Sequence, residues 1–197
     1  MLIWVCALHC EAKPLIDFYR LKKSADRGTY DTYQRDQISC IVSGMGQRNM
    51  AQAIDWAANQ FSSSTVSCWI NLGVAGDKSL AIGSTVLASR VSQIDLSGQT
   101  DWLETSSPLA HRFIAKAVTS LQREQTDYDS DSLYDMEAFA FIHSTRQYAP
   151  AERCQSIKII SDNSDNPPHR NKARISQLIA DNIPAITDYA AQLHQLR

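Results

Sequence analysis

The sequence of 197 residues lacks the features that mark membrane, secreted or nucleic-acid-binding proteins. Its apolar run Leu2–Leu8 is too short for a membrane span, and no basic residue precedes it, so we expect neither a transmembrane segment nor a signal peptide. Lys and Arg number 19 against 21 Asp and Glu, which gives a net charge of -2. Nucleic acids and acidic membranes select clustered positive charge, so we expect neither as a partner.

Cysteine is present but scattered, and the number of cysteines, five, is odd. This pattern does not suit a disulfide framework, so we expect reduced, mostly buried thiols in a cytoplasmic protein. Cys6, His9 and Cys10 could form one corner of a metal site, but no second group of ligands follows at a workable spacing. We therefore expect no metal and no cofactor.

The apolar fraction, 44%, suits a folded chain with one buried core, so we expect a single domain over residues 1–197. Short apolar runs alternate with segments of helical periodicity. We predict strands at Leu2–Leu8, Thr29–Tyr33, Gln37–Ser43, Val66–Leu72, Ser84–Ile94 and Ser156–Ile160. We predict helices at Glu11–Lys23, Asn49–Phe61, Pro108–Arg123, Leu133–Tyr148 and Arg170–Leu196, the last broken or kinked at Pro184.

Alternating strands and helices predict an α/β protein with a central mixed twisted sheet flanked by helices. Most of the strands are too apolar for an exposed face, so helices should cover both sides of the sheet. The polar, acidic segment Glu124–Ser132 is interpreted as a solvated loop, because it lacks the pattern of a calcium-binding loop.

Glycine is scarce, with seven in the chain, yet five of them lie between Gly44 and Gly83. One group, in residues 43–49, follows a predicted strand and precedes a predicted helix; the other, in residues 71–77, also follows a strand. The first is not a dinucleotide fingerprint, because Asn49 stands at the third glycine position, and a simple tight turn is an alternative. Two such turns at the carboxyl ends of strands favour a ligand pocket.

Three carboxylates stand in surroundings that disfavour a charge. Glu11 follows the apolar first strand, Glu137 lies in a nearly apolar run, and Asp162 follows the apolar strand that ends at Ile160. Glu11 and Asp162 could each be a helix cap, and Glu137 could face solvent on an amphipathic helix. Together the three suggest a site that needs several carboxylates with shifted proton affinities.

Four blocks of residues, in order, resemble the nucleoside phosphorylase and nucleosidase superfamily. The resemblance is strongest to its branch of 5′-methylthioadenosine/S-adenosylhomocysteine nucleosidases and futalosine hydrolases. The blocks are Ala7–Glu11, Ser43–Gly46, Ile70–Gly76, and Asp135–Ala138 followed by Ile160–Asn163.

The resemblance implies roles for individual residues. Glu11 would activate the attacking water, and Asp162 would protonate the leaving purine. Glu137 would hold the ribose 2′ and 3′ hydroxyls, with Met136 against the sugar. The remaining substrate contacts implied are Gly44, Met45, Gly46, Gly73, Val74, Lys158 and Ser161. These roles suit cleavage of an N-glycosidic bond, in which the base must leave as a stabilised species from an oxocarbenium-like sugar.

The chain also departs from the family pattern. Lys158 replaces an arginine near the sugar, and Val74 replaces a serine or threonine. Asn71 stands where phosphorylases carry an arginine, which leaves Arg48 as the nearby candidate for binding an anion such as phosphate. The region of about residues 95–135, which should recognise the base, is short.

We therefore predict an enzyme that hydrolyses a purine-type nucleoside. Phosphorolysis on the same fold, or nucleoside binding without catalysis, are the alternatives. By the same resemblance, we expect a homodimer or a higher homo-oligomer.

Overall fold

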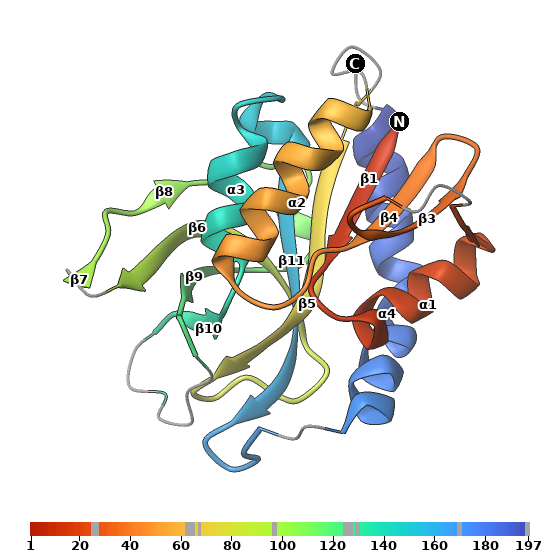
Figure 1. Ribbon diagram of the computed structural model, residues 1–197. Coiled ribbons are helices and arrows are strands. Elements are labelled where there is room, and N and C mark those ends of the chain that lie inside the picture. The colour runs from red at the N-terminus through yellow and green to blue at the C-terminus, as the bar shows by residue number, and fades with distance from the viewer. Residues whose placement is uncertain are drawn as a thin grey trace.

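The computed structural model describes residues 1–24, 28–61, 66, 68–95, 98–123, 128, 131–168 and 171–195 (Figure 1). The α-helices are α1 (His9–Tyr19), α2 (Gln47–Gln60), α3 (Ala138–Thr145) and α4 (Lys172–Gln195). The strands are β1 (Leu2–Cys6), β2 (Lys22–Lys23), β3 (Asp31–Arg35), β4 (Ile38–Val42), β5 (Cys68–Asp77), β6 (Thr85–Asp95), β7 (Gly98–Gln99), β8 (Leu103–Glu104), β9 (Ile114–Ser120), β10 (Leu133–Asp135) and β11 (Cys154–Asn163).

One mixed sheet runs through the molecule in the order β10-β9-β6-β11-β5-β1-β4-β3-β2, and β7 and β8 pair with β6. Strands β4, β1, β5 and β11 are parallel neighbours, so their carboxyl ends meet at one edge of the sheet. The strands predicted at Thr29–Tyr33 and Gln37–Ser43 are the antiparallel pair β3 and β4. These pairings confirm the α/β class and the mixed sheet.

Helices cover both faces of the sheet, as the apolar strands predict. Figure 1 shows α1 and α4 on one face and α2 and α3 on the other. All five residues of β1 are buried, and they alternate between the two cores: Leu2 and Trp4 pack in the core under α1 and α4, whereas Ile3 and Val5 pack in the core under α2 and α3. None of the described helices combines the length and the apolar character that a membrane crossing requires.

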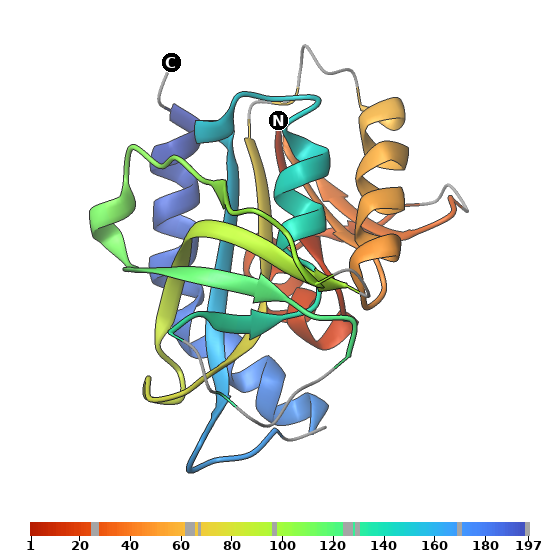
Figure 2. The same ribbon diagram turned by 90° about the vertical axis from the view of Figure 1, so that its left-hand side faces the viewer.

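One end of the sheet closes on itself. Strand β10 pairs with β9, and Tyr134 of β10 also pairs with Gly76 of β5. The strands β5, β11, β6, β9 and β10 therefore form a ring, seen on the near side of Figure 2. The ring brings β10, and the residues that follow it, to the carboxyl end of β5.

One predicted helix is wrong, and another is confirmed only from Ala138 onward. The segment Pro108–Arg123 contains a 3₁₀ turn and then the strand β9, which pairs with β6 and β10. Its β-branched residues Ile114, Val118 and Thr119 fit a strand. Pairing on both sides outweighs the helical spacing of the apolar residues Ile114, Ala117, Val118 and Leu121. The segment Leu133–Tyr148 begins as the strand β10, and the helix α3 occupies only Ala138–Thr145.

The two glycine groups differ in structure. Gly44 and Gly46 have positive φ angles of 83° and 92°, so the predicted turn before α2 is confirmed. The predicted second turn is wrong, because Gly73 and Gly76 lie within β5, which continues to Asp77. Helix α4 is continuous through Pro184, so the chain is not broken there. Figure 2 shows the first turns of α4 inclined to the rest of the helix.

Candidate active site

Four charged residues from three parts of the chain meet at the carboxyl edge of the sheet. They are Glu11 of α1, Asp135 of β10, Glu137 at the start of α3 and Lys158 of β11, and we call them the charged cluster. Each is buried, with at most 7% of its surface exposed. Buried charges are costly unless they are paired, so their contacts decide what the cluster can do.

Glu11 is buried where the first turn of α1 meets the middle of β5. One carboxylate oxygen accepts the Leu8 N–H at 2.8 Å, and the other accepts the Val74 N–H at 3.1 Å. Glu11 therefore caps the start of α1, as predicted, and the same carboxylate also contacts β5. Burial raises the pKa of Glu11, and the positive charge of Lys158 opposes this rise.

Close approach explains the glycine at position 73. A Cβ atom there would lie 3.0 Å from Glu11 Oε1 and 3.5 Å from Lys158 Nζ. Lys158 pairs with Gly73 in the register of β11 and β5. Gly73 thus lies between the carboxylate and the ammonium group, and a larger residue would displace one of them.

Lys158 carries the positive charge of the cluster. Its side chain is 1% exposed, and Nζ lies 2.7 Å from Asp135 Oδ2. Burial alone would lower the pKa of Lys158, but the charges of Asp135, Glu137 and Glu11 outweigh burial and raise it. The lysine is therefore held as an ammonium ion among three carboxyl groups.

Asp135 is a residue that the sequence analysis quoted in a motif without giving it a role. Its Oδ2 accepts the N–H groups of Ala138 at 2.8 Å and Glu137 at 3.2 Å, and its Oδ1 accepts the Ser120 hydroxyl at 2.5 Å. It therefore caps α3 while pairing with Lys158. An acid just before a helix indicates such a cap. The predicted helix begins at Leu133, which places Asp135 inside the helix and conceals its role as a cap.

Glu137, at the start of α3, contacts the start of α2, the other helix on the same face of the sheet. Its Oε1 accepts the Gly46 N–H at 2.6 Å, at the start of α2. Burial, followed by the charge of Asp135, raises the pKa of Glu137 to about 8. The expectation that Glu137 could face solvent is wrong, since the side chain is buried.

Asp162 lies near the end of β11, beyond a bulge at Ser161. The Tyr128 and Ser161 hydroxyls each donate to one of its carboxylate oxygens. A Cβ atom at position 76 would lie 2.6 Å from Asp162 Oδ2 and 2.5 Å from Tyr128 Cε1, which explains the second glycine of β5. No described helix begins at Asp162, so its interpretation as a helix cap is wrong.

Tyr128 is the second functional candidate that the sequence analysis missed. It belongs to the segment predicted as a solvated loop, of which residues 124–127 and 129–130 lie outside the described part of the chain. Tyr128 is 5% exposed, and its ring is tilted by 32° against that of Tyr134, with ring centroids 6.0 Å apart. An aromatic residue within an acidic stretch was the available signal.

The other predicted site residues lie around this edge. Met45 is exposed and Met136 is half-buried. Exposed Arg48 and Met45 line a pocket of about 440 Å³ with Gly46, whose N–H meets Glu137. Within the described ranges, no group of three or more His, Cys, Asp or Glu side chains is placed to hold a metal ion.

The two acids Glu11 and Asp162 contact opposite ends of one short stretch of β5. Glu11 lies against Gly73 and Asp162 against Gly76, three residues further along the strand. Three residues of a strand span about 10 Å along its backbone, so the two acids contact separate parts of β5.

The sheet order and the four flanking helices give the chain the nucleoside phosphorylase-like fold that the resemblance predicts. Solved nucleosidases have this fold. A 5′-methylthioadenosine nucleosidase of Arabidopsis thaliana has a TM-score of 0.81 at 16% identity, covering 100% of this chain and 96% of the neighbour. For the 5′-methylthioadenosine/S-adenosylhomocysteine nucleosidase of Helicobacter pylori with butyl-thio-DADMe-Immucillin-A, the TM-score is 0.78 at 14% identity, with 97% of each chain covered.

A mutant futalosine hydrolase of Helicobacter pylori has a TM-score of 0.77 at 15% identity, with 97% of this chain and 98% of that chain covered. No protein-family model matches the sequence, and no curated protein matches it. At these identities the likeness concerns the fold, and the chemistry has to be argued from the site.

Proposed function

We propose that this chain hydrolyses the N-glycosidic bond of a purine-type nucleoside and releases the free base. The observation that carries the proposal is the placement of two buried carboxylates, Glu11 and Asp162, at the two ends of the Gly73–Gly76 stretch. The printed names of the structural neighbours, nucleosidases and a futalosine hydrolase, support the same reaction class.

In this proposal Glu11 is the general base. It takes a proton from water as the water attacks C1′, and the charge of Lys158 opposes the rise in the pKa of Glu11 that burial causes. The Leu8 and Val74 N–H groups fix the orientation of the carboxylate. A base that is held in place from two sides needs little reorganisation when the water binds.

Asp162 is the proposed general acid. As the bond between C1′ and the base breaks, the carboxyl gives its proton to a ring nitrogen of the leaving base, which then departs neutral. The Tyr128 and Ser161 hydroxyls hold the carboxyl at the end of β11. The ring of Tyr128 against Gly76 offers an aromatic wall on the side where the base leaves.

Glu137 is the proposed ribose ligand, reaching the 2′ and 3′ hydroxyls from the start of α3. Its contact with the Gly46 N–H places it at the turn before α2, across the sheet edge from Glu11. Above its raised pKa, the ionised Glu137 can accept both hydroxyls of a diol at once and so hold the sugar between the two acids. Met136, the neighbouring residue, is the proposed apolar contact for the sugar.

Hydrolysis is favoured over phosphorolysis by the residues next to Glu11. Asn71 donates to the Val5 C=O at 3.0 Å and accepts the Ser156 hydroxyl at 3.0 Å, so its side chain is already committed within the core. Val74 offers only its N–H, which Glu11 accepts. Phosphate sites need bidentate arginine or hydroxyl donors, and Arg48 is the described cation nearest in sequence to the glycine turn.

The deciding experiment is a panel of purine nucleosides assayed for base release with and without phosphate. We expect release without phosphate and free ribose as the second product. A strict phosphate requirement with sugar 1-phosphate as product would overturn hydrolysis in favour of phosphorolysis, and Arg48→Ala should then raise KM for phosphate. Heat stabilisation by nucleosides without base release over hours would instead mean binding alone.

We also propose that the protein works in the cytoplasm as a homodimer or a higher homo-oligomer. All five cysteines are free and buried, which suits a reducing compartment. Light scattering coupled to gel filtration measures the subunit number, and a monomer at micromolar concentration would contradict the oligomer.

A further inference from the structure

Lys158 lies among three carboxyl groups, but it forms an ion pair with one of them. Its Nζ is 2.7 Å from Asp135 Oδ2, and no other carboxylate of the described residues lies within ion-pair distance of it. Glu11 and Glu137 act on the lysine by charge from further away. Because the lysine is buried, water cannot replace a carboxylate beside it, so the choice of partner decides which carboxylate oxygens stay free.

The ammonium of Lys158 is also close to Glu11. A Cβ atom at position 73 would lie 3.0 Å from Glu11 Oε1 and 3.5 Å from Lys158 Nζ, so the two groups flank the same point of β5. A rotation about the last bonds of the lysine side chain would bring the ammonium to the glutamate. The observed position of the ammonium therefore depends on its partner, Asp135.

Asp135 is held in place by hydrogen bonds from two neighbouring elements. Its Oδ1 accepts the hydroxyl of Ser120, which is its register partner in β9. Its Oδ2 accepts the N–H groups of Glu137 and Ala138 at the start of α3. A carboxylate fixed by three donors cannot follow a flexible ammonium, so the ammonium takes the position that the carboxylate sets.

This position matters for the reaction if the proposed function holds, on which the inference rests. From a distance the ammonium opposes the effect of burial on Glu11, but in direct contact it would occupy an oxygen that has to accept a proton from water. In contact with Glu137 it would compete with the ribose diol. We propose that Asp135 is a positioning residue, which holds the Lys158 ammonium away from Glu11 and Glu137 and so leaves both carboxylates free for water and sugar.

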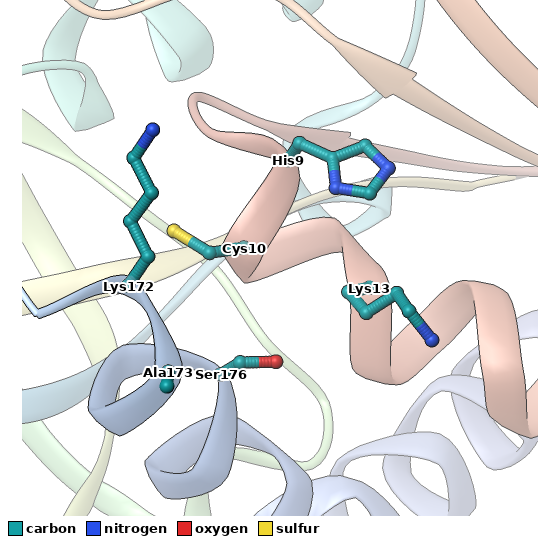
Figure 3. Close-up of a pocket in the computed structure, with 6 residues that line it drawn as sticks. All are labelled: His9, Cys10, Lys13, Lys172, Ala173 and Ser176. Carbon is teal, nitrogen blue, oxygen red and sulfur yellow. The ribbon is translucent and has the colours of Figure 1, made fainter.

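Two thiols also face the charged cluster, and neither should titrate in the acidic range. The hydrogen bond with Cys40, followed by burial, raises the pKa of Cys6, and burial, followed by the charge of Glu11, raises the pKa of Cys10. Figure 3 shows the Cys10 side chain directed from α1 toward Lys172 at the start of α4. The acidic limb of a pH profile therefore reports carboxyl groups and not these thiols.

The test compares the pH profiles of kcat/KM for base release by the wild type and by Asp135→Asn. Asparagine can still cap α3, but it has no charge to hold the lysine. The freed ammonium should pair with Glu11 or Glu137, and because a contacting positive charge lowers the pKa of a carboxyl group, the acidic limb should move down by about 1 pH unit. Adding Lys158→Met removes the ammonium and should move the limb back up.

Ser120→Ala is the matched control. It removes the hydrogen bond to the other oxygen of Asp135 and the acceptor of the Phe139 N–H, but it keeps the ion pair. We expect Ser120→Ala to lose stability with its acidic limb unmoved, whereas a purely structural role of Asp135 would make the two variants alike. Asp135→Glu, which keeps the charge, should keep the limb near its wild-type pH. Asp135→Ser, which also provides a capping residue, takes the place of Asp135→Asn if that variant does not fold.

An unmoved acidic limb in Asp135→Asn, or a shift that remains after Lys158→Met is added, would overturn the inference. If no nucleoside is cleaved, the proposed function fails, and an NMR titration of the Glu11 and Glu137 carboxyl carbons then decides the inference by itself. Lower pKa values in Asp135→Asn, raised again by adding Lys158→Met, would uphold it. Equal pKa values in the variant and the wild type would reject it.

Discussion

The two ends of the Gly73–Gly76 stretch hold their carboxylates in different ways. At the Gly73 end, Glu11 belongs to an ionic network with Lys158 and receives N–H groups from regular elements. At the Gly76 end, Asp162 follows a bulge and receives hydroxyl groups, one of them from Tyr128. A lysine favours the ionised form of an acid beside it, which suits a base.

Under the proposed function, this contrast means that one strand presents two acids for opposite tasks: a base near Gly73, at the base end, and an acid near Gly76, at the acid end. The base end is built on a helix start and two central strands, so its geometry is fixed by the core. The acid end depends on Tyr128, which comes from outside the regular elements. Changes at the base end should therefore damage both the fold and the chemistry, whereas changes at the acid end should act mainly on the chemistry.

The largest effect is expected for Lys158→Met. It leaves Asp135 and Glu11 buried without their cation, and breaking a buried pair costs about 3–5 kcal/mol. Urea unfolding at pH 7 measures the loss, and Lys78→Met, which removes an exposed lysine, should cost less than about 0.5 kcal/mol. Adding Asp135→Asn to Lys158→Met should restore part of the stability. A loss under about 1 kcal/mol would show that the charged cluster does not depend on the lysine.

The second effect is on turnover. Asp162→Asn keeps the shape of the side chain but removes the proton, so kcat should fall by about 10²-fold or more with little change in nucleoside affinity. Asp165→Asn, the same substitution at an exposed position of the next turn, should keep the wild-type rate. If Asp162→Asn lowers the melting temperature but leaves kcat within a few-fold, the carboxyl is structural and the contrast between the two ends fails.

The residues near Gly73 could be predicted from the sequence to lie together, and their catalytic roles stay predictions. The acids Glu11 and Glu137, the glycine turn before α2 and the lysine at 158 all lie where block order and apolar context place them. The layered α/β fold followed from the alternation of apolar strands with periodic helices. These features depend on local pattern and burial, which a sequence displays directly.

The acid end depended on long-range pairing and was predicted less well. Strand β9 has helical spacing in sequence and becomes a strand only because β6 and β10 lie beside it. The sequence around Gly73 and Gly76 predicts a turn. The contacts of Glu11 and Asp162 with these glycines are long-range, so no local pattern indicates that the strand continues. Tyr128 lies in an acidic stretch, and its contact with Asp162, 34 residues further along the chain, has no local sequence signal.

A third effect is a change in the pH dependence of stability caused by Glu137. Its pKa is raised to about 8 by burial in the folded state, whereas the unfolded chain releases this proton at ordinary carboxyl pH. The folded state therefore binds more protons between these two values, and the wild type should lose stability as pH rises toward 8. Glu137→Gln should be more stable than wild type at pH 8, by up to about 4 kcal/mol, because each unit of the rise from 4.5 to about 8 corresponds to about 1.4 kcal/mol. The advantage should vanish near pH 4.

Unfolding curves from pH 4 to pH 8.5 measure this difference. Glu152→Gln, an exposed acid, should give a curve parallel to that of the wild type. Parallel curves for Glu137→Gln as well would mean that Glu137 is ionised in the folded protein throughout this range.

The smallest expected change, in the free energy of unfolding and in kcat, is that of Tyr128→Phe at the acid end. Tyr128→Phe keeps the ring against Gly76 and Tyr134 but removes the hydroxyl that Asp162 accepts. Loss of one buried hydrogen bond costs about 1–2 kcal/mol. Tyr148→Phe is a matched control, because it removes the same kind of bond, from Tyr148 to Asp55, at an exposed position, where the cost should be under about 0.5 kcal/mol. Urea unfolding compares the two variants. The value of kcat for base release should change more in Tyr128→Phe than in the control, because the Tyr128 hydroxyl touches the proposed acid.

Equal losses of stability and unchanged turnover in both variants would place Tyr128 outside the site and leave Asp162 to be held by Ser161 and the strand.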